Sequence, residues 1–204
     1  MTYPAKLCVI SPHILTVPMP IRPGSQNSKP IYLLAFAGLL VRQDPQGRFT
    51  FEQVYRHDRI GAQSIELLTE MCDLVAATDM TLAAFRLSDL AKSLLQVPMG
   101  SEHQAQGKVA LLRWRDAIFR QPIDVAFPDA EGGLQTLKRE ALSHDLMAEW
   151  DEPGASHNPG RLRLQLCDRT QAMWLAIARE HLSSAKMQLA EDDFLAWKED
   201  ELID

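Results

Sequence analysis

The eleven residues I-Y-L-L-A-F-A-G-L-L-V, numbers 31–41, decide the fold of this 204-residue chain. They form its longest apolar run, bounded by Pro30 and the polar stretch 42–48. A run of this length is typical of a strand that is buried on both faces. The turn sequence D-P-Q-G at 44–47 leads into residues 48–56, where apolar and polar residues alternate more. The two segments together predict a β-hairpin.

Further strands and helices are expected on both sides of this hairpin. Residues 6–17 are rich in Val, Ile and Leu and predict an earlier strand, although Pro12 interrupts them. The proline-rich residues 18–30 predict an irregular loop. After the hairpin, the apolar spacing predicts a helix at 64–77, a strand at 80–85, and a helix that begins near Leu87 and ends before Pro98.

The second half of the chain is expected to be mainly helical. Ser101 and Gln104 match a capping box for a helix that runs to about Phe119. Two more helices are expected, at 134–147 after the pair Gly132-Gly133 and at 168–186, with a short strand at 123–127 and a loop at 151–160. Residues 161–166 alternate leucine with polar residues, which allows either a strand or an approach to the last helix.

This order of elements predicts an α/β fold. We expect a mixed β-sheet, an early antiparallel meander followed by alternating strands and helices, with helices packed on its faces. The length favours a single domain over residues 1–190, followed by an acidic C-terminal tail, residues 191–204.

The tail accounts for the whole net charge of −6, because it carries seven acids against Lys198. The remaining residues are therefore electrically balanced and carry no global signature of nucleic-acid binding. Two interpretations of the tail stay open. Either it packs on the body through Phe194, Leu195 and Trp197, or it binds a protein partner.

Cysteine and apolar patterns favour a cytoplasmic protein without a membrane anchor. Cys8, Cys72 and Cys167 are scattered and form no CxxC pair, so neither a disulfide framework nor a zinc site is indicated, and free thiols suit a reducing compartment. Prolines interrupt any signal-peptide core near the N-terminus, and the longest apolar run is well short of the ~20 residues of a membrane span.

Two blocks of sequence resemble a known family. S-I-E-L-L-T-E-M-C-D-L-V-A-A-T-D-M-T-L-A-A-F-R-L-S-D-L-A-K-S-L-L, residues 64–95, and C-D-R-T-Q-A-M-W-L-A-I-A-R, beginning at Cys167, are similar to segments of the 3′–5′ exonucleases of the DEDD superfamily. The resemblance implies a ribonuclease H-like fold over most of the chain. It implies that Asp89, just after a strand, and Asp168, near the start of the late helix, are catalytic and metal-binding acids.

Such enzymes need several carboxylates at one point. Two Mg²⁺ or Mn²⁺ ions about 3.5–4 Å apart activate water and stabilise the leaving oxygen, and these hard cations prefer carboxylate oxygen. The family's first strand supplies an Asp-x-Glu pair, but this chain has no acid before Asp44, and H-I-L-T-V-P at 13–18 stands where that pair is expected. Leu164 and Arg163 occupy the places of the His or Tyr that orients the attacking water.

Basic residues suggest two places for single-stranded nucleic acid. One group consists of Lys108, Arg113 and Arg115, with Trp114 among them and Arg120 following. Arg161, Arg163 and Arg169 form a smaller one. The alternative for the first group is the solvated face of a helix whose tryptophan lies in the core. A cysteine nucleophile is conceivable at Cys167, which lies near the expected start of the late helix. The sequence contains no glycine-rich loop of the kind that binds phosphate.

Three functions follow as hypotheses. The preferred one is an exonuclease-like domain that has lost metal-dependent hydrolysis and binds nucleic acid or a protein partner. The second is an active, divergent 3′–5′ exonuclease that needs Mg²⁺ or Mn²⁺ and uses Asp89, Asp168 and a further acid such as Asp124. The third is an interaction or assembly protein unrelated to nucleic acid.

Overall fold

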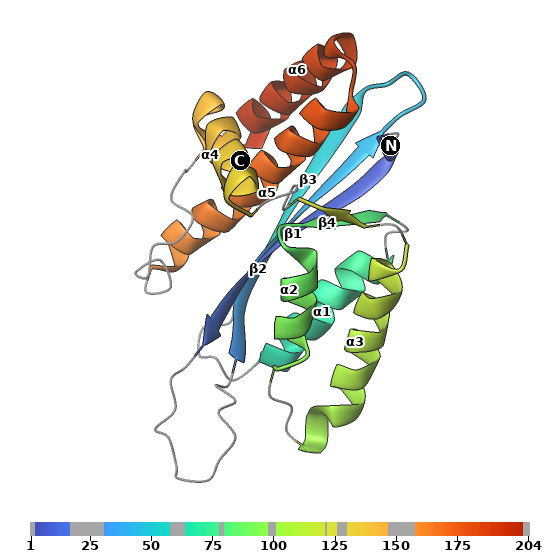
Figure 1. The fold of residues 1–204 in the computed structure, drawn as a ribbon, viewed down its shortest axis with the longest axis vertical. Coiled ribbons are helices and arrows are strands. Elements are labelled where there is room, and N and C mark those ends of the chain that lie inside the picture. Colours follow the sequence, from blue (N-terminus) through green and yellow to red (C-terminus); the bar gives the residue numbers. More distant parts are fainter. Residues whose placement is uncertain are drawn as a thin grey trace.

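The computed structural model describes residues 3–16, 31–57, 64–77, 80–97, 101–120, 122–125, 130–146 and 158–201 (Figure 1). Five strands and six α-helices lie within these ranges. In chain order they are β1 Lys6–Thr16, β2 Ile31–Gln43, β3 Phe49–His57, α1 Ser64–Ala77, β4 Thr81–Ala84, α2 Leu87–Leu94, α3 Gln104–Ile118, β5 Ile123–Asp124, α4 Ala130–Ser143, α5 Pro159–His181 and α6 Ser184–Glu201.

The strands form one mixed sheet in the order β3-β2-β1-β4-β5. β1, β2 and β3 are an antiparallel meander, whereas β4 is parallel to β1 and β5 is parallel to β4. The predicted α/β class, the mixed sheet and the hairpin are confirmed. At the hairpin turn, Gly47 has a φ of 89°, a left-handed conformation that glycine adopts without steric cost.

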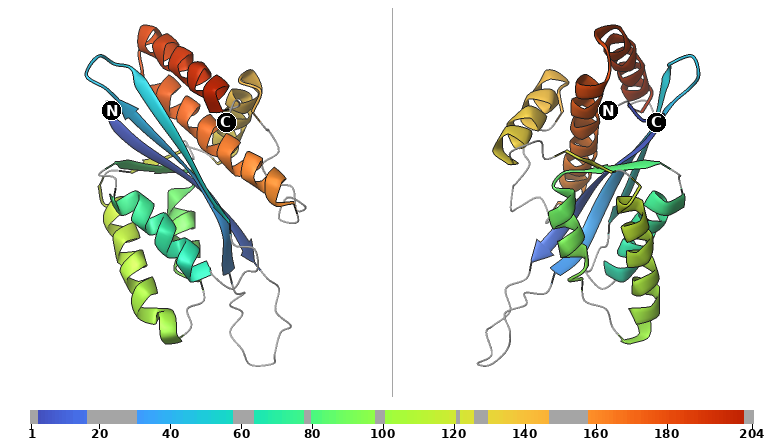
Figure 2. Two further views of the ribbon diagram at one scale, coloured as in Figure 1. Left: turned by 180° about the vertical axis from the view of Figure 1, so that it is seen from behind. Right: turned by 45° about the vertical axis from the view of Figure 1, so that its right-hand side comes forward.

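Helices cover both faces of the sheet (Figures 1 and 2). Because side chains alternate along a strand, Leu7 and Val9 of β1 pack toward α5 and α6, whereas Cys8 and Ile10 pack toward α1 and α2. Gly38 lies within the apolar run 31–41. A larger residue at this position would place its Cβ atom 2.9 Å from the side chain of Leu74 in α1, so the close packing of α1 on β2 favours glycine here. Within the described residues, no helix combines the length and apolar character needed to cross a membrane.

The late helix begins earlier than its sequence indicated. α5 starts at Pro159, after Asn158, whose side chain accepts a hydrogen bond of 3.1 Å from the backbone N–H of Arg161. Residues 161–166 are therefore helical and form no strand. Asp168 lies nine residues after the start of α5, in the interior of the helix and not near its N-terminus.

Smaller differences concern the other boundaries. α4 includes Gly132 and Gly133, so the glycine pair does not delay the helix. Ser101 opens a short 3-10 turn, and α3 begins at Gln104 with His103 at its N-cap, so the α-helix starts later than the expected cap at Ser101 indicated. The described part of the strand expected at 123–127 is β5, of only two residues. The expected loop at 18–30 and residues 151–157 lie outside the described residues.

The acidic segment is continuous with α6, which crosses the expected boundary at residue 190. Phe194 is fully buried and Trp197 packs against the same core, whereas Leu195 is half exposed. Asp193 is also buried: its Oδ2 accepts a hydrogen bond of 2.7 Å from the N–H of Phe49, and its other oxygen pairs with Arg48. One acid of the tail thus ties α6 to the start of β3.

We predict that Asp193→Ala lowers the free energy of unfolding by about 1–3 kcal/mol, because a buried N–H group loses its acceptor. Urea unfolding followed by circular dichroism measures this change. Arg42→Ala is the control and is expected to cost under ~1 kcal/mol, because its ion pair with Glu52 joins two side chains that are 46% and 56% exposed. Equal losses in the two variants would show that the buried carboxylate of Asp193 contributes no more than an exposed ion pair.

Candidate functional site

A crevice opens where β1 and β4 part. β4 pairs with β1 only along residues 7–10, and after Ala84 the chain turns away through Phe85 and Arg86 into α2. β1 continues to Thr16, paired with β2 on its other edge. In open α/β sheets, ligands bind at the carboxyl ends of strands where the strand order reverses. The β1–β4 junction is such a point, because the chain moves outward from it through β2 and β3 on one side and through β4 and β5 on the other.

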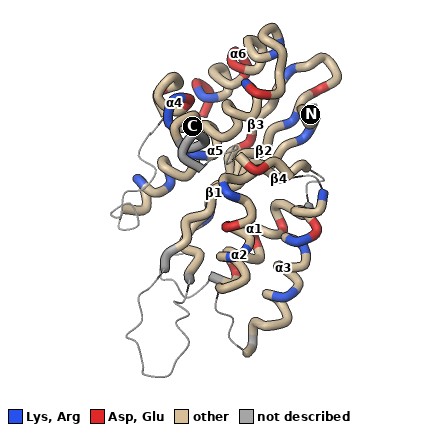
Figure 3. Tube along the Cα trace, in the orientation of Figure 1, with Lys and Arg blue, Asp and Glu red and all other residues tan. Residues whose placement is uncertain are grey.

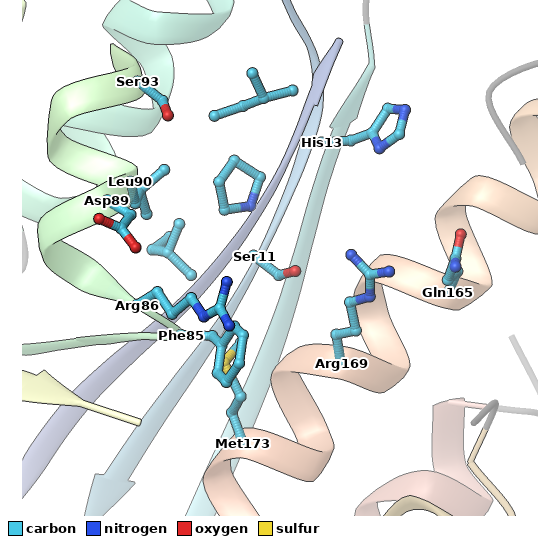
Figure 4. A pocket seen from close by; sticks show the side chains of 13 residues that line it. Ser11, His13, Phe85, Arg86, Asp89, Leu90, Ser93, Gln165, Arg169 and Met173 are labelled. Carbon is cyan, nitrogen blue, oxygen red and sulfur yellow. The ribbon is translucent and has the colours of Figure 1, made fainter. Parts of the chain in front are cut away.

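The crevice holds a cavity of about 490 Å³ walled by three elements (Figure 4). Its volume falls in the range of small-molecule sites. The polar side chains that line it are Ser11 and His13 from β1, Arg86, Asp89 and Ser93 from α2 and its N-cap, and Gln165 and Arg169 from α5. Apolar lining comes from Ile10, Pro12, Ile14, Phe85, Leu90 and Met173.

Local periodicity explains which side chains reach the cavity. Ser11 and His13 continue the alternation of Leu7 and Val9, so they lie on the face of β1 that α5 covers. Gln165 and Arg169 are four residues apart and share one face of α5. The β1–β2 register shifts between His13 and Ile14, an irregularity of the kind that redirects side chains beside functional sites.

Arg86 occupies a strained position at the cavity wall. Its φ of 50° and ψ of 56° lie in the left-handed region, which costs a side-chain-bearing residue roughly 1–2 kcal/mol relative to the right-handed one. It stands at the N-cap of α2 without forming a side-chain cap bond, and its guanidinium carbon lies 5.4 Å from the centre of the Phe85 ring. The conformation directs the guanidinium group into the cavity (Figure 4).

The surroundings of His13 disfavour its protonated form. Its pKa is lowered mainly because burial disfavours the charged ring, and also because Arg169 and His57 are close. Its Nε2 atom is buried and has no hydrogen-bond partner within the described part of the chain. The cavity therefore combines two guanidinium groups with an unsatisfied ring nitrogen.

The two acids expected from the family resemblance are not brought together in this cavity. Asp89 lines it, is exposed, and pairs with Lys92 at 3.5 Å. Asp168 is not among the lining residues, although its neighbour Arg169 is, and Asp124 at the end of β5 does not line it either. Among the residues that the structure describes, no three His, Cys, Asp or Glu side chains form a group that could hold a metal ion.

The basic group of α3 lies apart from the cavity lining. Lys108 is exposed, Arg113 pairs with Asp73 of α1, and Arg115 pairs with its neighbour Asp116. Figure 3 shows positive and negative positions interspersed over these helices. Trp114 is buried in the core beneath them, so no tryptophan ring is presented for stacking on bases here.

Cys167 does not have the environment of a nucleophile. Burial raises the pKa of its thiol to about 12, against the effect of nearby Arg163. The residue lies inside α5, whose N-terminus is at Pro159, so no helix terminus activates it. The nucleophile role considered for Cys167 is therefore not supported by its position.

Ser11, His13 and Arg86 were not singled out as a binding group from the sequence. Only the i, i+2 spacing of Ser11 and His13 on either side of Pro12, together with the dipeptide Phe85-Arg86 directly after a short strand, could have indicated them.

A scan of the chain against protein-family models found no match, and a search of curated proteins found none either. The site is therefore interpreted from its own geometry.

We predict that all three thiols of the folded protein react slowly with a disulfide reagent at pH 8, since burial raises the pKa of Cys8, Cys72 and Cys167 to about 12. Absorbance of the released thiolate measures the rate, and the same sample in denaturant is the control, where all should react at once. A single fast thiol in the folded protein would contradict this assignment.

We also predict that His13 makes the protein less stable as the pH falls. The unfolded chain takes up a proton at the usual histidine pKa of about 6.5, whereas folded His13 does so at a lower pH. Between these values the unfolded state binds more protons, so stability decreases with decreasing pH. In a phosphate-free buffer, His13→Gln should show a smaller fall in melting temperature between pH 7.5 and 5.5 than the wild type. An identical fall in both proteins would remove His13 from the account.

Proposed function

We propose that this chain is a ribonuclease H-like domain, related to the 3′–5′ exonucleases, that binds single-stranded nucleic acid without efficient metal-dependent hydrolysis. One observation carries the proposal. The cavity at the β1–β4 junction is lined by Arg86, Arg169 and His13, and the one carboxylate among its described lining residues is that of Asp89. This composition suits a phosphate group better than a pair of divalent cations.

The position of the cavity supports the relationship to exonucleases. The resemblance implies metal-binding acids on the first strand, just after a later strand, and on the late helix. β1, the start of α2 and α5 are the elements that wall the cavity. The antiparallel meander followed by parallel strands joined through helices is also the arrangement that the resemblance leads us to expect.

The lining residues support the loss of hydrolysis. Residues two apart on a strand share a face. The two polar residues of β1 that line the cavity are Ser11 and His13. An Asp-x-Glu pair was expected in the segment 13–18, which begins with His13, and Ser11 precedes that segment. On α5, Arg169 lines the cavity and Asp168 does not. Among the described lining residues, a hard cation would meet one carboxylate and two guanidinium groups, whose like charge opposes its binding.

A path for a nucleic-acid strand leads out of the cavity along α5. Arg161, Gln165 and Arg169 are spaced by four residues and so lie on one face of this helix. Eight residues of α-helix rise about 12 Å, so the two arginines can meet different phosphates of one strand. This face is favoured over Lys108, Arg113 and Arg115 of α3, because Gln165 and Arg169 line the cavity and none of those three residues does.

The test is binding of fluorescent single-stranded DNA and RNA oligonucleotides, followed by anisotropy. We predict binding that weakens about tenfold between 50 and 200 mM salt, as expected when two or three phosphates are neutralised. Arg169→Gln should weaken it further at fixed salt. Lys186→Gln, which removes an exposed positive charge from α6, is the matched control.

Two outcomes would overturn the proposal. Degradation of the labelled strand in Mn²⁺, abolished by Asp168→Ala, would support the active nuclease that also uses Asp89. No binding of either oligonucleotide, together with a stable oligomer in solution, would favour the interaction protein, with the exposed acids Glu199, Asp200 and Glu201 of α6 as its contact surface.

A further inference from the structure

We infer that the cavity between β1, α2 and α5 is a metal-independent clamp for a phosphate monoester, with Arg86 and Arg169 holding the phosphate from opposite walls. The inference deepens the proposed function and rests on it for the source of the ligand, a phosphorylated end of a nucleic-acid strand. A free nucleotide carries the same chemistry and is distinguished by the experiment below.

Geometry brings the two guanidinium groups to one space. Arg86 stands at the N-cap of α2 and Arg169 on α5, and the two residues are 83 positions apart in the chain. Figure 4 shows both side chains extending into the space between these helices, with Ser11 of β1 behind it. A guanidinium has five N–H donors in a fork, so each arginine can keep a bond within the protein and still donate to an anion.

The number of oxygens distinguishes a monoester from an internal phosphodiester. Each guanidinium fork binds two oxygens of one anion best. A phosphodiester offers only two unesterified oxygens, whereas a monoester offers three and carries up to two negative charges near neutral pH. Two arginines on facing walls therefore match the end of a strand, and Ser11, which lies between them and is buried, supplies a hydroxyl group.

The rest of the cavity is suited to the carbon part of such a ligand. Pro12, Ile14 and Leu90 form an apolar wall on the side toward α2. The volume of about 490 Å³ exceeds what a phosphate ion needs and lies within the range for small-molecule ligands. The ligand is therefore a phosphate attached to an organic group of about nucleotide size.

The left-handed conformation of Arg86 allows a variant that separates a structural role of this residue from a role in phosphate binding. Glycine adopts the left-handed region without penalty, so Arg86→Gly removes the guanidinium and relieves backbone strain at once. A purely structural role predicts loss of stability in this variant. The clamp predicts loss of phosphate binding with an unchanged or higher melting temperature.

The experiment compares one oligonucleotide sequence with a 5′-phosphate, a 3′-phosphate or hydroxyl ends, and adds adenosine 5′-monophosphate, adenosine and inorganic phosphate as small probes. Titration calorimetry with metal chelated by EDTA measures each affinity. We expect one phosphorylated end to bind at least about tenfold tighter than the hydroxyl ends, which corresponds to charge-assisted hydrogen bonds. Arg86→Gly and Arg169→Gln should each abolish this preference, and Lys186→Gln should keep it.

The pKa of His13 reports where the phosphate binds, in addition to how tightly it binds. Arg169 of α5 and His57 of β3 are close enough to His13 to lower its pKa, and Arg86 and Asp89 line the same cavity. A bound phosphate dianion adds negative charge beside the ring, which favours its protonated form. Histidine NMR titration with adenosine 5′-monophosphate should therefore raise the pKa of His13, and adenosine should leave it unchanged.

The outcomes separate this inference from the proposed function. Equal affinity for phosphorylated and hydroxyl ends, or a preference that survives both arginine variants, overturns the clamp and leaves nucleic-acid binding in place. Arginine-dependent binding of adenosine 5′-monophosphate without binding of any oligonucleotide supports the clamp and overturns nucleic-acid binding. Failure of every probe to bind overturns both.

Discussion

The partial pairing of β1 with β4 is the constraint on which the site depends. β1 is covered by helices on both faces and paired with β2 along its length, but β4 accompanies it only as far as Ile10. Pro12 has no N–H to donate, and proline is accommodated in a strand where one edge is unpaired. The backbone of β4 turns away from β1 after Ala84, so β4 does not pair with β1 beyond Ile10. A cavity lies beside this unpaired part of β1, and Ser11 and His13 line it.

Strands and helices were predictable where the length or spacing of apolar residues fitted one kind of element, and not where it fitted both. The strand at 31–41 and the helix at 64–77 were predicted because length or spacing allowed only one structure in each. Residues 161–166 were ambiguous, since leucine at every second position fits a strand, whereas Leu162 and Leu166 alone fit a helix. The structure resolves this through burial: those two leucines are buried and Leu164 is 56% exposed. Asn158-Pro159, a cap followed by proline, was the local signal for the true start.

Convergence in space explains why the cavity was only partly foreseen. Asp89 was singled out and does line it, because its place after a strand could be identified along the chain. The partners of Asp89 depend on the register of β1 and on which face of α5 meets the sheet, and a one-residue rotation of the helix face separates Arg169 from Asp168. The left-handed conformation of Arg86 could not be anticipated either, since arginine rarely adopts it.

The sign of the charge in the cavity determines what chemistry it favours. Carboxylates bind divalent cations, and those cations bind phosphate, lower the pKa of a bound water molecule and so produce a nucleophile. Guanidinium groups bind phosphate directly but do not coordinate water, so they supply the attraction without the nucleophile. Arg86 and Arg169 are moreover held by packed elements, and preorganised cations lose little freedom when an anion arrives. Under the proposed function, a cavity lined in this way retains a phosphate without cleaving it.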